Sequence, residues 1–136
     1  MSKTLVKKII KAAHGIGFLA TIDGTTPRVR PMACQLTNEN VLWSATFSKS
    51  RKMKQLKDAP RAEICFMDDK MQHVRLSGRI KVITDLKKKR AFYKKNPDLK
   101  QYFASPDDES FVMLEMKPTK VELMGAGEMK YAKVSM

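Results

Sequence analysis

Residues 42–56 of the chain, LWSATFSKSRKMKQL, change from an apolar strand pattern to a basic helix pattern across a short polar turn. Residues 41–47 predict a strand, and a helix is expected to begin at Arg51. Arg51, Lys52 and Lys54 crowd the start of that helix, where unpaired N–H groups and the helix dipole already make the potential positive. Basic side chains fit this position when an anion such as phosphate binds there. A solvated basic face without a ligand is the alternative that this stretch leaves open.

The composition indicates a folded and strongly basic protein. With 136 residues, 43% of them hydrophobic and 30% charged, the chain is long enough for a single domain over 1–136 with a sizeable core. No apolar run approaches the length of about 20 residues that a transmembrane helix needs. The formal net charge of +13 favours an anionic partner, whether nucleic acid, a membrane surface or a phosphorylated small molecule. The aromatic content of 7% gives little support to base-stacking platforms.

Cysteine and histidine usage argues against a disulfide framework and against a metal centre. Cys34 and Cys65 fall inside predicted strands without a CxxC spacing, so core thiols are expected. His14 and His73 lie far apart in the sequence, and no metal site is predicted. The basic N-terminal segment lacks the continuous apolar stretch of a secretory signal. A cytoplasmic location is therefore expected.

The residues before position 42 predict a helix and a β-hairpin. An amphipathic helix is expected over 2–13, within an N-terminal helical segment 1–14, and Gly15 fits the left-handed position that ends a helix. Strands are expected over 17–22 and 28–36, because an Asp-Gly turn signal stands between two strand-like runs.

Pro31 marks a special point in the second of these strands. Proline cannot donate a hydrogen bond to a neighbouring strand, so Pro31 predicts a break in pairing that leaves backbone groups free for a ligand. Arg30 stands next to this break and is a candidate ligand contact. An ordinary exposed strand arginine is the alternative for Arg30.

The residues after position 56 predict more strands and peripheral helices. Strict alternation from Val74 to Val82 predicts a long strand with one buried face, and Gly78 predicts a bend of the kind that barrels need. The expected elements are strands over 62–67, 71–83, 111–116 and 120–124, helices over 86–94 and 97–103, and a tail over 125–136 anchored by Tyr131 and Val134. This order indicates a mainly β fold, a small barrel with peripheral helices.

Four segments follow one another in an order that is characteristic of a known family. They are GFLATIDGTTPRVRPM (17–32), LWSATFSKSRKMKQLKDAPRAEICF (42–66), HVRLSGRIKVI (73–83) and MLEMKPTKVELM (113–124). In this order the chain resembles the pyridoxamine 5′-phosphate oxidase-like, FMN-binding split-barrel proteins over most of its length. The resemblance implies a six-stranded antiparallel split β-barrel. It also implies a homodimer with FMN sites between the subunits.

The resemblance further implies which residues contact the flavin. The Ser-Arg-Lys turn is implied to hold the phosphate, the Arg-Pro-Met segment to run beside the isoalloxazine ring, and the preceding strand to flank the ribityl chain. An arginine, a lysine, a hydroxyl and a helix N-terminus suit a dianion. The implied contacts are Ser50, Arg51 and Lys52 at the phosphate, Arg30, Pro31, Met32 and Ala33 at the ring, Ser44 and Thr46 on the flanking strand, and His73 at a ring contact open to contribution by the second subunit.

The chain departs from the true oxidases of this family. It is shorter and lacks the extended C-terminal segment, with its arginine and histidine, that binds the substrate phosphate in those enzymes. Vitamin B6 oxidation is therefore not expected. No residue stands out as a catalytic acid, base or nucleophile. The sequence predicts an FMN-binding protein that acts as a small flavin-dependent oxidoreductase on an unassigned substrate, with the redox chemistry supplied by the flavin.

Other ligands and other classes of function remain open at the level of sequence. Relatives of this architecture bind a deazaflavin or haem, and His14 or His73 is then the available axial ligand. A non-enzymatic nucleic-acid-binding module would show tight, steeply salt-dependent binding. Membrane association through the basic amphipathic helix 2–13 is a further alternative. The last two leave the Arg-Pro-Met and Ser-Arg-Lys segments unexplained.

Overall fold

The computed structural model describes residues 2–136, and Met1, the first residue of the expected helical segment 1–14 and of the expected domain 1–136, lies outside them. Strands predominate, as the sequence predicts. In chain order the elements are α1 (Ser2–Ala12), β1 (Ile16–Asp23), β2 (Thr26–Leu36), β3 (Leu42–Phe47), α2 (Arg51–Asp58), β4 (Arg61–Met67), β5 (His73–Ile83), α3 (Leu86–Lys95), the 3₁₀-helix η1 (Pro97–Gln101), β6 (Phe111–Met124) and β7 (Ala132–Lys133).

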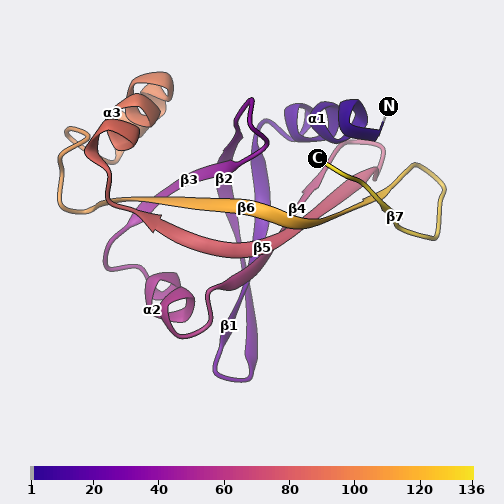
Figure 1. Cartoon of the computed structure of the whole chain (residues 1–136), viewed down its shortest axis with the longest axis horizontal. Coiled ribbons are helices and arrows are strands. Elements are labelled where there is room, and N and C mark those ends of the chain that lie inside the picture. The colour runs from indigo at the N-terminus through magenta and orange to yellow at the C-terminus, as the bar shows by residue number, and fades with distance from the viewer. Residues whose placement is uncertain (1) are drawn as a thin grey trace.

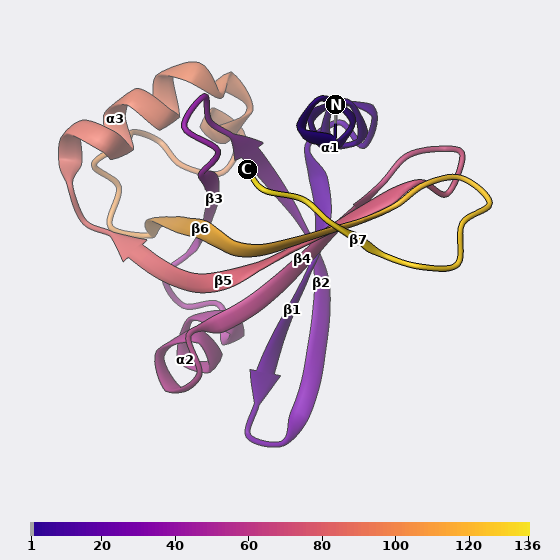
Figure 2. The same ribbon diagram turned by 45° about the vertical axis from the view of Figure 1, so that its right-hand side comes forward.

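Strands β1 to β6 form a closed antiparallel barrel, which confirms the predicted fold class. The sheet has the order β3-β2-β1-β4-β5-β6-β7, and the additional pairing of β3 with β6 closes the barrel. The long strands β5 and β6 cross the middle of the molecule, and the β1–β2 hairpin projects from it (Figure 1). After rotation, α1 and α3 are seen at the top, and α2 lies below β5 and beside the β1–β2 hairpin (Figure 2).

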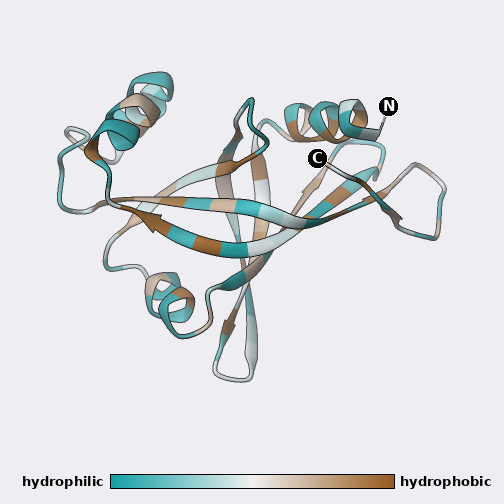
Figure 3. Ribbon diagram, in the orientation of Figure 1, coloured by the Kyte–Doolittle hydropathy of each residue, from teal (hydrophilic) through white to brown (hydrophobic). Residues whose placement is uncertain are grey.

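The main core fills the barrel interior. Phe66, Val74 and Leu76 are completely buried there, and hydrophobic and hydrophilic residues alternate along β5 and β6 (Figure 3). The apolar side of α1 belongs to the same cluster, because Val6 and Ile9 are buried against it. Since this side of α1 is covered by the barrel, it is not presented to a membrane surface. Among residues 2–136, no helix has both the length and the apolar character needed to cross a bilayer.

Gly78 marks the predicted bend in the barrel wall. The register between β5 and β6 shifts between Ser77 and Gly78, so that β6 carries an extra residue, Thr119. A Cβ atom on Gly78 would lie 2.8 Å from the backbone oxygen of Lys117, which leaves room only for glycine. The irregularity also accommodates Pro118, so β6 runs through both of the segments predicted at 111–116 and 120–124.

The end of β5 departs from the predicted alternation. Val82 is exposed and Ile83 is buried. The reason is a second apolar cluster outside the barrel, in which α3 and η1 cover Ile83, Phe111 and Met113. A period-2 pattern identifies the two faces of a strand, but it does not say that a helix later covers the outer one.

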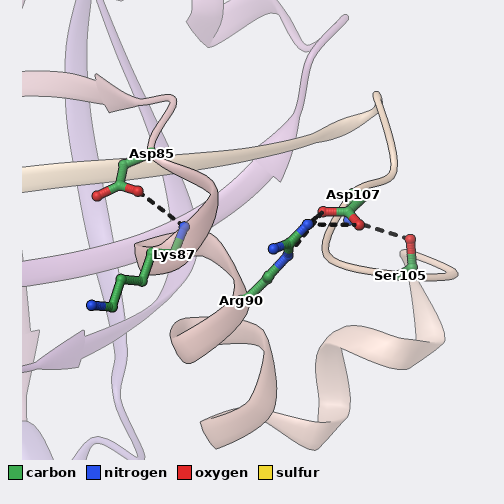
Figure 4. A network of polar contacts seen from close by, with 5 residues as sticks. All are labelled: Asp85, Lys87, Arg90, Ser105 and Asp107. Atoms are coloured by element: carbon green, nitrogen blue, oxygen red, sulfur yellow. Dashed lines mark hydrogen bonds and ion pairs between the residues drawn. The ribbon is translucent and has the colours of Figure 1, made fainter.

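Polar contacts fix α3 in place over this outer cluster. The Asp85 carboxylate caps the helix by accepting from the Lys87 amide at 2.9 Å (Figure 4). Arg90 reaches the Asp107 carboxylate at 3.3 Å, which ties the helix to the following acidic loop (Figure 4). The buried Tyr93 hydroxyl donates to the Phe103 carbonyl at 2.8 Å. The segment after α3 is therefore held close to the end of β3.

Candidate functional site

The candidate site lies where strands β2 and β3 separate. Only residues 34–36 of β2 pair with residues 42–44 of β3, and the rest of β2 pairs with β1 alone. At the branch point the Cys34 amide donates to the Gly15 carbonyl at 2.7 Å. A cleft of about 450 Å³ opens between the separated strands, and Pro31, Met32 and Ala33 line one side of it. This volume lies in the usual range for small-molecule sites, about 300–1,000 Å³.

A lysine and two hydroxyls meet on the other side of the cleft. Lys52, in the first turn of α2, donates from Nζ to Thr46 Oγ1 at 2.6 Å. Thr46 Oγ1 lies 3.3 Å from the Ser50 hydroxyl, whose residue is the N-cap of α2 and makes no side-chain capping bond. Burial, and then the positive charge of Arg30, lower the pKa of Lys52. An anion in the cleft would offset both effects, because a nearby negative charge favours the charged form of lysine.

Arg30 is held by a network of buried polar groups beneath α2. Its guanidinium donates to Gln55 Oε1 at 2.8 Å, to Thr21 Oγ1 at 2.7 Å and to the Leu19 carbonyl at 3.2 Å. The Thr21 hydroxyl also donates to Gln55 Oε1 at 2.6 Å. Burial, and then the charge of Arg28, lower the pKa of Arg30. The network fixes this cation in one orientation, although no carboxylate belongs to it.

A smaller pocket of about 260 Å³, here called the basic pocket, adjoins the cleft and shares Lys52 with it. Arg28, Arg30 and Arg51 also line the basic pocket. Within residues 2–136 the one acidic lining residue, Asp23, pairs with Arg28 at 3.8 Å, and no carboxylate forms an ion pair with Arg30, Arg51 or Lys52. Several cations without an acidic partner beside a cleft have the character of an anion-binding site.

Most of the residues implied by the resemblance are brought together here, and two are not. Ser44 is buried, and its hydroxyl donates to the Ala33 carbonyl at 2.8 Å, so it joins the strands instead of lining the cleft. His73 begins β5 and lies outside both the cleft and the basic pocket. Its ring nitrogens contact the Met71 carbonyl at 2.9 Å and the Tyr131 hydroxyl at 2.7 Å.

Some lining and positioning residues have no clear signal in the sequence. Thr21 and Gln55 orient Arg30, but each looks like an ordinary polar residue in its own segment. The aromatic wall of the cleft comes largely from the residues that directly follow η1, Tyr102 and Phe103. The Asn-Pro start of that short helix is recognisable, but where it packs depends on the contacts of α3.

The fold and the site together define a split-barrel protein with a cation-lined pocket beside the cleft between two separated strands. The chain matches the family described as pyridoxamine 5′-phosphate oxidase over residues 4–125, so it belongs to this family. No curated protein matches the sequence.

Solved structures with the same fold carry several different descriptions. A NimC/NimA family protein from Clostridium acetobutylicum is 27% identical, with 96% of this chain and 92% of that chain covered and a TM-score of 0.80. A pyridoxamine 5′-phosphate oxidase-related, FMN-binding protein from Nostoc punctiforme is 19% identical, with coverages of 89% and 82% and a TM-score of 0.72. A heme-binding protein from Mycobacterium smegmatis is 20% identical, with coverages of 93% and 55% and a TM-score of 0.74.

Proposed function

We propose that this protein binds FMN and acts as a small flavin-dependent oxidoreductase. The observation that carries the proposal is the group of cations without acidic partners, Arg30, Arg51 and Lys52, placed where the cleft meets the basic pocket. A phosphate dianion matches these donors in charge and in hydrogen bonding. The family as a whole, and the FMN-binding relative from Nostoc punctiforme, favour a flavin as the carrier of that phosphate.

The residues present fit FMN along the length of the cleft. Arg51, Lys52 and the Ser50 hydroxyl are suited to the phosphate, because they surround the start of α2. The Pro31–Ala33 segment and Thr46 are suited to the ribityl chain and the ring, because they line the cleft next to Lys52.

FMN supplies the redox chemistry when it is bound, and the protein binds and orients it. Arg30 and Lys52 keep the phosphate end positive, while Gln55 and Thr21 hold Arg30 in place. Residues of α3 and η1, among them Phe92 and Leu99, bound the cleft on one side. No side chain of the cleft is needed as a nucleophile. Substrate specificity therefore depends on the shape and polarity of the cleft walls.

We further propose that the working form is a homodimer in the reducing environment of the cytoplasm. Phe18 and Val29 are 52% and 68% exposed on the outer face of the β1–β2 hairpin, which is unusual for large apolar side chains. His73 lies outside the cleft of its own chain, so it contacts the flavin only if the second subunit supplies it. Cys34 and Cys65 are both free thiols, as the reducing compartment requires.

The absorption spectrum of the purified protein tests the cofactor, with the released chromophore identified by mass. A flavin spectrum and an FMN dissociation constant of about 1 μM or tighter are expected. Side-by-side titrations with a deazaflavin and with haem distinguish the related ligands. A colourless protein that does not bind FMN would overturn the proposal, and a Soret band would assign haem in its place.

A further inference from the structure

A second concave surface, apart from the candidate site, runs between helices α1 and α3. Two adjoining hollows of about 440 and 680 Å³ share residues 36–38, where β2 ends, so together they form one groove. Both helices lie on the side of the molecule opposite the tip of the β1–β2 hairpin (Figure 1, Figure 2). We call this surface the lysine groove after the cations that line it, which are Lys7 and Lys11 of α1, Lys88 and Lys95 of α3, and Lys117 of β6.

The positive charge of the lysine groove is only partly balanced by acidic side chains. Helices α1 and α3 together carry nine lysines and one arginine and contain no carboxylate. Glu39 and Glu115 line the groove, and Glu115 lies 3.7 Å from Lys88. Within residues 2–136, no carboxylate forms an ion pair with Lys7, Lys11, Lys95 or Lys117. The groove therefore has an excess of positive charge, which attracts a partner with several negative charges.

The shape of the lysine groove favours a flexible chain over a flat surface. Its cations come from two helices that flank the turn between β2 and β3, so they line both halves of a concave surface. A single strand with repeated phosphates can follow such a groove and contact both halves. A bilayer is flat on this scale and would reach only the outer edges of the two helices.

One fixed aromatic ring lines the larger half of the groove. Trp43, on β3, is half-buried there, and its indole N–H donates to Glu115 Oε2 at 2.8 Å. The ring also meets Phe92 edge-on, with centroids 5.9 Å apart. These two contacts hold the ring in one orientation beside Lys88 and Lys95. An aromatic side chain next to cations that contact phosphates is the arrangement on which unpaired bases stack.

We propose that the lysine groove binds single-stranded nucleic acid, with the phosphates on its lysines and a base on Trp43. The inference goes beyond the proposed flavin function and does not depend on it. The groove shares His14, Gly15 and Gln35 with the cleft, but none of its five lysines lines the cleft or the basic pocket. One chain can therefore hold FMN and a nucleic acid strand at the same time.

The fluorescence of Trp43 tests the proposal directly, because this is the one tryptophan of the chain. Oligothymidylate and oligouridylate of about 12 nucleotides are titrated into the full-length protein, with and without FMN. Both strands should quench the emission, and the tighter of the two identifies DNA or RNA. Between about 50 and 200 mM salt, the logarithm of the binding constant should fall with a slope of about −2 to −4, for three to five phosphates. Absence of binding, or binding that leaves the emission of Trp43 unchanged, would overturn the proposal.

Paired charge variants separate the lysine groove from the net charge of the whole protein. Lys11→Gln combined with Lys95→Gln removes one cation from each half of the groove, so the salt slope should become less steep by about 1 to 2. Lys70→Gln combined with Lys133→Gln is the matched control, because both lysines are exposed and lie outside the groove. The control should leave the slope unchanged. An equal loss of slope in the two double variants would overturn the proposal.

Two further anions test whether the partner is a nucleic acid. Inorganic polyphosphate with the same number of phosphates has no bases, so it should bind about fivefold or more weakly than the oligonucleotides, as the loss of one stacked base predicts. Equal affinities would show that Trp43 stacks no base and would overturn the proposal. Vesicles that contain phosphatidylserine should not sediment the protein at near-physiological salt. Sedimentation with these vesicles, together with no response of Trp43 to the oligonucleotides, would assign the two helices to a membrane surface instead.

Discussion

Lys52 lies in an environment that disfavours its positive charge unless an anion binds nearby. Its pKa is lowered by burial and by Arg30, so its positive charge is unfavourable where it stands. Lys52→Met should raise the FMN dissociation constant about 10- to 100-fold, since one charge-assisted hydrogen bond contributes about 1.5–3 kcal/mol. The melting temperature of the flavin-free protein should stay the same or rise, because a like charge near Arg30 is removed. Calorimetric titration and thermal unfolding measure the two effects.

Lys57→Met is the matched control for Lys52. Lys57 lies on the same short helix, α2, but lines neither the cleft nor the basic pocket. The Lys57→Met substitution removes the same charge as Lys52→Met, but at a position outside both pockets. It should therefore alter FMN affinity only slightly. If both variants weaken FMN equally, the effect comes from the net charge of the whole protein, and the assignment of Lys52 to the phosphate is wrong.

Ionisation of the Cys34 thiol should lower the free energy of unfolding as the pH rises into the alkaline range. Burial raises the pKa of this thiol from 9.0 to about 11, although its hydrogen bond with Ser44 acts in the opposite direction. Because the folded pKa is the higher one, the stabilising contribution is complete below pH 9 and is lost as the pH rises towards 11. The loss should amount to about 2–3 kcal/mol of the free energy of unfolding.

Urea unfolding of Cys34→Ala between pH 8 and pH 11 checks this prediction. Groups other than the Cys34 thiol titrate in both proteins, so the difference between the two curves isolates its contribution. The variant should lose less stability with rising pH than the natural sequence does. Parallel curves would show that Cys34 does not titrate differently in the folded and unfolded states.

At the scale of elements, the short C-terminal strand β7 depends on one side chain. The Tyr131 hydroxyl contacts His73 Nε2 at 2.7 Å, and the Arg75 guanidinium lies 3.7 Å from the centre of the Tyr131 ring. These contacts hold the tail beside β6, where the Val134 amide donates to the Val121 carbonyl at 2.9 Å. Tyr131→Ala should therefore increase the hydrogen exchange of the Val134 amide by about tenfold or more.

Tyr131→Phe serves as the control for the tail. It keeps the ring under Arg75 and removes only the hydroxyl, so its effect on the Val134 amide should be smaller, about 1 kcal/mol or less. Slow exchange of Val134 in the Tyr131→Ala variant would mean that the buried Val134 side chain alone anchors the tail.

The elements themselves were largely predictable because their signals are local. Gly15 and Gly24 have the positive φ angles of 69° and 64° that a helix end and a tight turn favour in glycine. The separation of β2 from β3 was not predictable in detail, since Pro31 signals a break but not which neighbour is lost. The bond between Arg30 and Gln55 spans 25 residues and requires the packing of α2 against β1. The aromatic wall at Tyr102 likewise depends on how α3 docks.

At the scale of the whole molecule, the apolar face of the β1–β2 hairpin is expected to be covered by a second copy of the chain. Phe18 and Val29 lie on this face and are mostly exposed in one chain. Phe18→Glu should give a monomer, because a buried charge without a partner opposes association. Light scattering after gel filtration measures the mass, and FMN affinity should fall about tenfold or more if the second subunit completes the site.

Met129→Glu is the control, since Met129 is 89% exposed on the tail and away from this face. A Phe18→Glu variant that stays dimeric would show that this face is not the interface. A monomer that binds FMN as tightly as the natural sequence would place the flavin site within a single chain.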